Sequence, residues 1–166
     1  MASRSEALAP VREVEAPEVA LPGRPDVTAD LMRGVARHLA ALGHGPLLEF
    51  VLPTGRRADV VGLGRSGEIV IVEVKSSPED YRADAKWPEY LEFCDRFYFA
   101  VAPGFPVELL PDGEGLLVAD RWGAEIIRPA VERTLGGARR RSLLLRFALK
   151  ASRRLASLTD PEIADL

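Results

Sequence analysis

An apolar run that ends in charged residues constrains this chain more than any other stretch. Residues 67–72 read Gly-Glu-Ile-Val-Ile-Val and predict a strand buried on both faces. The run closes with Glu73-Val74-Lys75. Charges at the covered end of a sheet are costly unless they are paired or bound to a metal. The tripeptide therefore indicates a site as well as a strand.

A second carboxylate is expected beside this tripeptide. Residues 57–63 predict another strand, joined to the first through Gly-Arg-Ser-Gly at 64–67, a composition typical of a hairpin turn. Asp59 then lies on the strand next to that of Glu73 and Lys75. Because side chains alternate along a strand, Glu73 and Lys75 point the same way. Two carboxylates and an ammonium group are expected to converge on one patch.

The two carboxylates are the ligands that a hard divalent cation prefers. Asp59 and Glu73 would supply two oxygens, and the carbonyl of Val74 a third. Mg²⁺ is the expected metal, with Mn²⁺ as an alternative, because Mg²⁺ needs few carboxylates and keeps several waters. Such a cation polarises a phosphoryl oxygen and acidifies a bound water, which Lys75 would orient. The alternative is a buried acid–lysine pair without a catalytic role.

The remaining pattern predicts the fold class. We expect a disordered or loosely attached leader at 1–25, a domain at 26–158 and a tail at 159–166. The order of elements predicts an α/β sandwich with a mixed central β-sheet flanked by helices. The expected elements are a helix from a Thr28 cap to Gly43, strands at 46–52, 57–63 and 67–75, a helix from a Ser77 cap to about Cys94 with a break before Pro88, strands at 96–101, 115–119 and 124–127, and a helix at 138–158.

Several classes of protein are disfavoured. The single cysteine, Cys94, excludes an internal disulfide and cysteine-based zinc motifs, and it suits a reducing compartment. No apolar run approaches the length of a membrane span, and no signal pattern opens the chain, so a cytoplasmic protein without a membrane is expected. His38 and His44 have no metal-type spacing with the charged triad and are expected to be ordinary helix and loop residues.

These residues resemble known nucleases. Asp59 followed across a hairpin by Glu73-Val74-Lys75 resembles the PD-(D/E)XK nuclease superfamily, with Ala58 in place of the proline. The closer resemblance is to the MmcB-type DNA repair family of bacteria, over about residues 26–155. It is carried by Gly55-Arg56-Arg57-Ala58-Asp59-Val60, Glu73-Val74-Lys75-Ser76-Ser77 and Asp84-Ala85-Lys86-Trp87-Pro88-Glu89-Tyr90. The resemblance implies a restriction-endonuclease-like fold, DNA as substrate, magnesium and a role in repair.

Three further residues are candidate auxiliaries. Relatives in the superfamily often carry a polar helix residue with a tyrosine four positions later, and Lys86 and Tyr90 have that spacing. The alternative is a surface lysine and a core tyrosine. Glu49, on the preceding strand, either points into the same cleft or lies on a solvated strand face.

Charge is unevenly distributed along the chain. The net charge is −3, yet residues 128–154 hold nine Arg or Lys and one acid, Glu132, a local net charge of +8. The last helix is expected to place an apolar stripe of Leu144, Ala148, Ala151, Leu155 and Leu158 opposite its cations. The cationic face of this helix either binds phosphate groups or is an ordinary solvated face. The candidate DNA-binding residues are Arg56, Arg57, Arg139, Arg140, Arg146, Lys150 and Arg153.

Three functions follow as hypotheses. The first is a metal-dependent DNA nuclease of the endonuclease type that acts in repair, in the bacterial cytoplasm at the nucleoid, with DNA as its partner and no small-molecule cofactor. The second is a DNA-binding repair-accessory protein that keeps the fold with little catalysis. The third is a protein-interaction domain whose triad is structural. The sequence leaves open whether the chain forms a homodimer.

Overall fold

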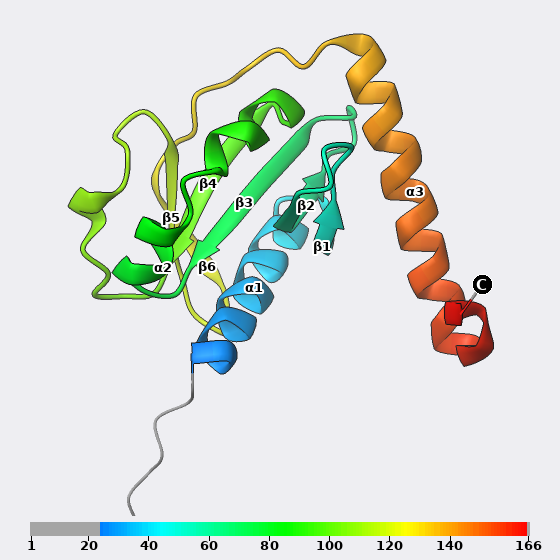
Figure 1. The fold of residues 1–166 in the computed structure, drawn as a ribbon, viewed down its shortest axis with the longest axis horizontal. Helices are drawn as coiled ribbons and strands as arrows, with labels where there is room; N and C mark the ends of the chain where they lie inside the picture. The colour runs from blue at the N-terminus through cyan, green and yellow to red at the C-terminus, as the bar shows by residue number, and fades with distance from the viewer. Residues whose placement is uncertain (1–23, 166) are drawn as a thin grey trace, which may run out of the picture.

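A six-stranded mixed sheet forms the centre of the molecule, and the computed structural model describes residues 24–165 (Figure 1). The strands lie side by side in sequence order, so β1 and β6 are the edges. Neighbouring strands are antiparallel except for the parallel pairs β3–β4 and β4–β5. The strands are β1 (Gly45–Val51), β2 (Arg57–Leu63), β3 (Ile69–Lys75), β4 (Arg96–Val101), β5 (Gly115–Ala119) and β6 (Ala124–Arg128).

Helices cover both faces of this sheet. Helix α1 (Arg24–Ala41) packs Leu31, Val35 and Leu39 against one face. The other face is covered by α2 (Pro78–Ala83), the 3₁₀ helix η1 (Trp87–Phe93) and the beginning of α3 (Gly137–Thr159). Every residue of β3 is buried, as its apolar run predicts. The expected α/β sandwich is confirmed, and it is consistent with a restriction-endonuclease-like fold.

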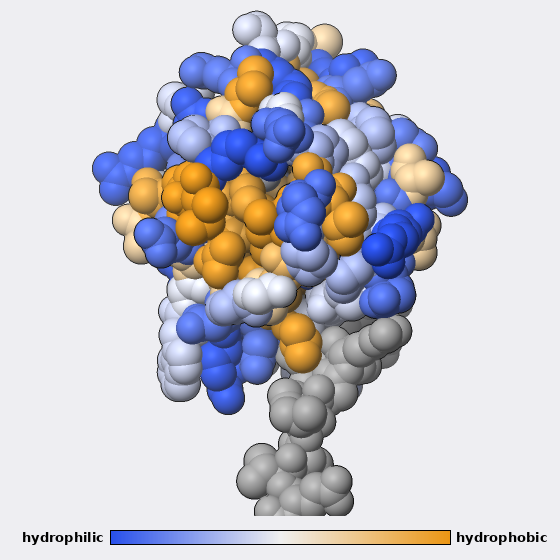
Figure 2. Space-filling model, turned by 90° about the vertical axis from the view of Figure 1, so that its left-hand side faces the viewer, coloured by the Kyte–Doolittle hydropathy of each residue, from blue (hydrophilic) through white to orange (hydrophobic). Residues whose placement is uncertain are grey.

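Two short 3₁₀ helices, η2 (Val107–Leu109) and η3 (Pro161–Asp165), complete the described chain. The edge strand β6 is mostly exposed, including Ile126 and Ile127. Figure 2 shows the face that lies at the left-hand side of Figure 1, where apolar side chains gather within a hydrophilic border. Within residues 24–165, no helix is long and apolar enough to cross a membrane.

Helix α1 begins earlier than the sequence indicated. Its first residue is Arg24, so Thr28 lies inside the helix and is not its N-cap. Pro25 is the second residue of this helix, where proline is tolerated because the N–H that it lacks has no partner in the first turn. Most of the expected leader, residues 1–23, lies outside the described residues.

The segment after β3 contains the predicted break. Ser77 caps α2, and its Oγ accepts a hydrogen bond from the amide of Asp80 at 3.2 Å. The second part, η1, is a 3₁₀ helix with about three residues per turn, so positions four apart lie on different faces. Lys86 is exposed at its start and Tyr90 is buried. The alternative, a surface lysine and a core tyrosine, is therefore the one observed.

Helix α3 has the predicted length but a different apolar contact face. Leu143 is its buried residue, Phe147 and Ala151 pack against the same core cluster, and Leu144 is partly buried. The stripe expected through Ala148, Leu155 and Leu158 is wrong, since the two leucines are 67% and 81% exposed. Figure 1 shows the reason, because α3 runs away from the sheet and only its first half meets the body.

Asp95 joins three distant parts of the chain. Its carboxylate accepts hydrogen bonds from the Ile69 amide at 2.7 Å and the Leu135 amide at 3.4 Å, and two from Arg140 at 2.7 Å each. Arg140 also donates to the Gly67 carbonyl at 2.6 Å. Burial disfavours the Asp95 carboxylate, but the bonds from Arg140 and Ile69 outweigh it and lower its pKa. Arg140, one of the candidate DNA-binding residues, thus holds α3 on the sheet through Asp95 and Gly67.

We predict that Asp95→Asn lowers the free energy of unfolding by about 2–3 kcal/mol at pH 7, because it leaves the Arg140 charge without its partner. The folded pKa of Asp95 is depressed, so this contribution is present above its unfolded pKa, about 3.9, and is lost as the pH falls through the folded value. Urea denaturation at pH 7 and pH 3 measures it. Asp112→Asn, which changes an exposed carboxylate, is the matched control and should leave stability unchanged. Equal stability of Asp95→Asn and wild type at pH 7 would contradict the assignment.

Candidate functional site

The β2–β3 hairpin brings Asp59, Glu73 and Lys75 together at one end of the sheet, as the sequence predicts. The regular ladder between the strands ends at the pair Val60 and Val72. Beyond it, the Asp59 carboxylate takes the place of a backbone acceptor and receives the Val74 amide hydrogen at 2.8 Å. A cleft of about 550 Å³ opens here, and its lining includes Thr28, Asp59, Glu73, Val74, Lys75, Ser76, Ser77, Glu79, Asp80 and Ala83.

Strand β2 is irregular where it delivers Asp59. Ala58 and Val61 pack into the same core cluster, whereas strict alternation would place residues three apart on opposite faces. On the neighbouring strand β1, Glu49 has a φ of 50°, a left-handed backbone conformation that is uncommon for a residue other than glycine. The sheet is therefore distorted at the level of Asp59. Such irregularities re-aim side chains next to functional sites.

Lys75 is held by two carboxylates. Its Nζ lies 2.6 Å from Asp84 Oδ2 and 3.3 Å from Glu73 Oε1, and its side chain is 3% exposed. Burial disfavours the ammonium form, but Glu73 and Asp84 together raise the pKa of Lys75. The bond from Lys75 likewise outweighs the burial of Asp84 and lowers its pKa. Lys75 is thus a fixed positive charge at the floor of the cleft.

Glu73 is the least satisfied group in the cleft. Burial, followed by repulsion from Asp59, raises its pKa to about 8. Its Oε1 faces Lys75, while its Oε2 is buried and has no hydrogen-bond partner within the described chain. Burial also raises the pKa of Asp59. An unpartnered buried carboxylate oxygen next to a second carboxylate calls for a proton or a cation.

The cleft is acidic overall and its donors fit a divalent cation. Asp59, Glu73, Glu79 and Asp80 line it, against the single cation Lys75. Asp80 is itself occupied, since it accepts hydrogen bonds from the Ser76 amide and hydroxyl. No group of three or more His, Cys, Asp or Glu residues positioned for a metal occurs within residues 24–165. A metal here would rest on Asp59 and Glu73, with backbone and water oxygens completing its shell, as Mg²⁺ allows.

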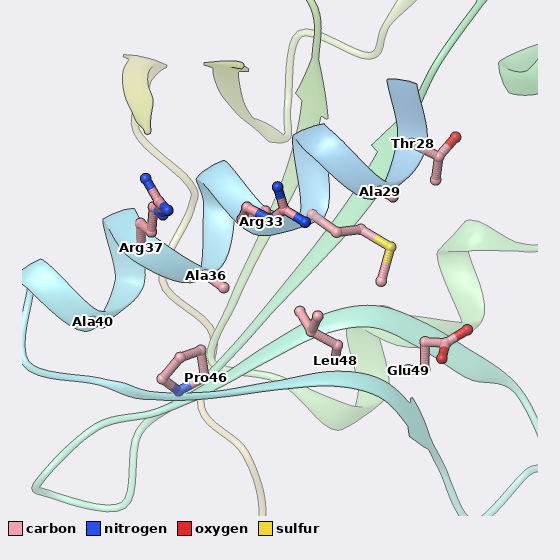
Figure 3. A pocket seen from close by; sticks show the side chains of 10 residues that line it. Thr28, Ala29, Arg33, Ala36, Arg37, Ala40, Pro46, Leu48 and Glu49 are labelled. Atoms are coloured by element: carbon pink, nitrogen blue, oxygen red, sulfur yellow. The ribbon is translucent and has the colours of Figure 1, made fainter. Parts of the chain in front are cut away.

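The candidate auxiliary residues lie outside this arrangement. Glu49 is at the rim of a second groove of about 860 Å³ between α1 and β1, with its carboxylate 3.3 Å from Arg57 (Figure 3). Its solvated-face alternative is the one observed. The Tyr90 hydroxyl donates to the Arg57 carbonyl at 3.1 Å, which ties η1 to β2, and Lys86 is exposed. Of the other predicted residues, Arg56 is paired with Glu89.

Asp84 is the site residue that sequence reasoning missed. It follows α2 directly, and its Oδ1 accepts the Lys86 amide hydrogen at 3.0 Å while its Oδ2 faces Lys75. Asp84 opens one of the segments that carry the family resemblance, and an aspartate that ends a helix before a Trp-Pro pair also favours a local turn. Neither feature indicated a contact with β3.

A family model described as DNA repair protein MmcB-like matches residues 16–162. Among solved structures, a protein of unknown function from Silicibacter pomeroyi is 55% identical in sequence and superposes with a TM-score of 0.77. That match covers 80% of this chain and 90% of the other. No curated protein matches the chain.

The raised pKa of Glu73 predicts an unusual dependence of stability on pH. Between its ordinary pKa of 4.5 and about 8, the folded state binds a proton that the unfolded state has released, so stability falls as the pH rises through this range and is level above it. We expect a fall of a few kcal/mol in urea denaturation between pH 5 and pH 8.5 in the wild type. Glu73→Gln should remove most of that fall.

The control for this prediction is Glu79→Gln, which removes an exposed carboxylate from the same cleft and should keep the wild-type slope. If Glu73→Gln and wild type lose stability in parallel between pH 5 and pH 8.5, the cleft does not raise the pKa of Glu73 and the prediction is wrong.

Proposed function

The chain belongs to the MmcB-like family of DNA repair proteins, and from this premise we propose that its acidic cleft hydrolyses DNA phosphodiester bonds with the help of a divalent cation. The observation that carries the proposal is the buried Oε2 of Glu73, which lacks a protein partner beside the second carboxylate, Asp59. The same residues resemble the catalytic motif of the PD-(D/E)XK nucleases. Substrate and metal are therefore inferred from chemistry and from the family.

Each residue of the triad has a role in this proposal. Asp59 and Glu73 would hold the cation, either Mg²⁺ or Mn²⁺, which supplies positive charge for a phosphoryl oxygen and lowers the pKa of a water. Lys75 is fixed beside Glu73 and faces the negative charge that builds on the phosphate when a water oxygen bonds to phosphorus and an ester bond breaks. Asp84 positions Lys75 through its 2.6 Å contact.

The charge of the cleft supports metal dependence. Four acids and one lysine line it, so a phosphate group would be repelled in the absence of a cation. A cation between Asp59 and Glu73 removes this repulsion and also satisfies the unpartnered oxygen of Glu73. Binding of the cation would thus let a phosphate enter the cleft and would also give the buried Glu73 carboxylate a partner.

A second candidate function is favoured by a specific contact. The 2.6 Å pair with Asp84 offsets the charge of Lys75, which weakens its pull on a phosphate. A DNA-binding repair-accessory protein with this fold and little catalysis would tolerate that arrangement. The cleavage experiment below separates the two candidates.

We predict that the wild type binds Mg²⁺ or Mn²⁺ and that Asp59→Asn/Glu73→Gln does not. Calorimetry at pH 8 should show one site in the wild type, and saturating Mg²⁺ should raise its melting temperature, because a ligand that binds the folded state stabilises it. Glu79→Gln is the matched control and should keep the site. Equal binding heats for the wild type and the double variant would rule out a metal site at these carboxylates.

We predict that Lys75→Met lowers single-turnover cleavage by at least about 100-fold, because it removes a charge that acts on the transition state. The affinity for DNA should change by less than about twofold, since this contact contributes little to ground-state binding. The substrates are branched, flapped, single-stranded and plain duplex DNA with Mg²⁺ or Mn²⁺. Lys75→Met/Asp84→Asn, which also removes the Asp84 charge that Lys75 balances, controls for misfolding. If the wild type binds these DNAs but cuts none of them, the accessory function is correct.

A further inference from the structure

Helix α3 carries charge of one sign. Across its 23 residues it contains no Asp or Glu, and its cations are Arg139, Arg140, Arg141, Arg146, Lys150, Arg153 and Arg154. Two of them are used by the body of the protein. Arg140 binds Asp95 at 2.7 Å, and Arg139 lies 3.3 Å from Glu92. The remaining five form no ion pair with any residue of the described chain.

The spacing of these free cations is unfavourable for the helix alone. Arg146 and Lys150 are four residues apart, and Lys150 and Arg153 are three apart, so the three side chains share one face. Like charges at such spacings destabilise a helix by about 0.2–0.5 kcal/mol per pair. All three side chains are exposed. An external anion would turn this repulsion into attraction.

The same three cations line a concave surface. Arg146, Lys150 and Arg153 border a hollow of about 240 Å³ between α3 and the end of β1, together with Phe50, Val51 and Leu149. Val51 is paired with Arg57 in the β1–β2 ladder. Asp59 lies two residues beyond Arg57 on β2, roughly 7 Å along the strand. The cationic hollow and the acidic cleft therefore lie at the same end of the sheet, connected by the first residues of β2.

We propose that Arg146, Lys150 and Arg153 form a phosphate-binding surface that holds duplex DNA by its backbone, outside the acidic cleft. The inference rests on the proposed function for its partner, DNA, but not for cleavage. Contacts from flexible cations to phosphates position a protein on DNA without reading bases. Single strands are a weaker fit, because the aromatic residue of α3, Phe147, packs against Phe50 with ring centroids 5.9 Å apart and offers no stacking surface.

Other occupants of this surface fit less well. A second copy of α3 would bring two helices without acids together, and the like charges would repel. An anionic membrane would attract the cations, and the exposed leucines of α3 are Leu145, Leu149, Leu155 and Leu158. A helix that lies on a membrane inserts Trp, Phe or Leu side chains opposite its cations, and the aromatic side chain of α3, Phe147, packs against the core instead. Duplex DNA is the occupant that needs only the charge that is present.

The test is binding of a 20-base-pair duplex to full-length Arg146→Gln/Lys150→Gln/Arg153→Gln, measured by fluorescence anisotropy across a range of KCl without divalent cations. Without a metal the cleft does not contribute, so the result is independent of whether the protein cuts DNA. The affinity should fall at least tenfold at low salt. The slope of log K against log salt should decrease by up to about 2.7, because each lost phosphate contact removes about 0.9. Glutamine keeps helix propensity and removes two like-charge pairs, so the melting temperature should not fall.

The matched control is Arg33→Gln/Arg37→Gln/Arg121→Gln, which removes the same net charge from exposed arginines on α1 and the β5–β6 turn. It should keep the wild-type affinity and slope. A lysine version, Arg146→Lys/Arg153→Lys, should also bind like the wild type.

Three results would overturn the proposal. The first is unchanged affinity and slope in the glutamine variant. The second is an equal loss in the control, which would show an effect of net charge alone. The third is unchanged DNA binding in the glutamine variant combined with lost binding to phosphatidylserine vesicles, which would make α3 a membrane-surface helix.

Discussion

The charge balance at the end of β3 is the constraint on which the site depends. This strand is buried along its whole length, and yet it ends in Glu73 and Lys75. Lys75 is balanced by Asp84 at 2.6 Å and by one oxygen of Glu73. The other oxygen of Glu73 has no partner in the described chain, and Asp59 beside it adds repulsion. The fold thus leaves a buried carboxylate oxygen without a partner at the place where the cleft opens.

The rest of the body keeps these groups in place through apolar contacts. Trp87 packs on Phe97 and Phe99 of β4, with ring centroids 5.7 and 5.2 Å apart, and this fixes η1 against the sheet. The Tyr90 hydroxyl ties the same element to β2 at Arg57. Asp84 lies in the short connection between α2 and η1, so the packing of η1 also holds the Asp84 carboxylate in position. A site built on packed strands and anchored turns is held more rigidly than one on free loops.

Acidic and basic regions are separated on this molecule, and the separation suits a polyanionic partner. The cleft gathers carboxylates around one lysine, whereas α3 gathers cations without any acid. In the functions proposed above, the helix would supply the general attraction to the DNA backbone, which is independent of base sequence. The cleft would admit a phosphate only with a cation in place. Attraction and chemistry would then be controlled by different residues.

The sequence by itself determined the hairpin, most of the strands and the convergence of Asp59, Glu73 and Lys75. These features depend on local periodicity and on turn composition, which neighbouring residues carry. Only the tertiary structure decided that Asp84 pairs with Lys75, that Arg140 serves Asp95, and that Leu155 and Leu158 stay exposed. Each of these depends on which surface a distant element meets. A helical pattern shows that an apolar or charged side chain exists on a given face, but long-range packing alone decides whether that face is covered.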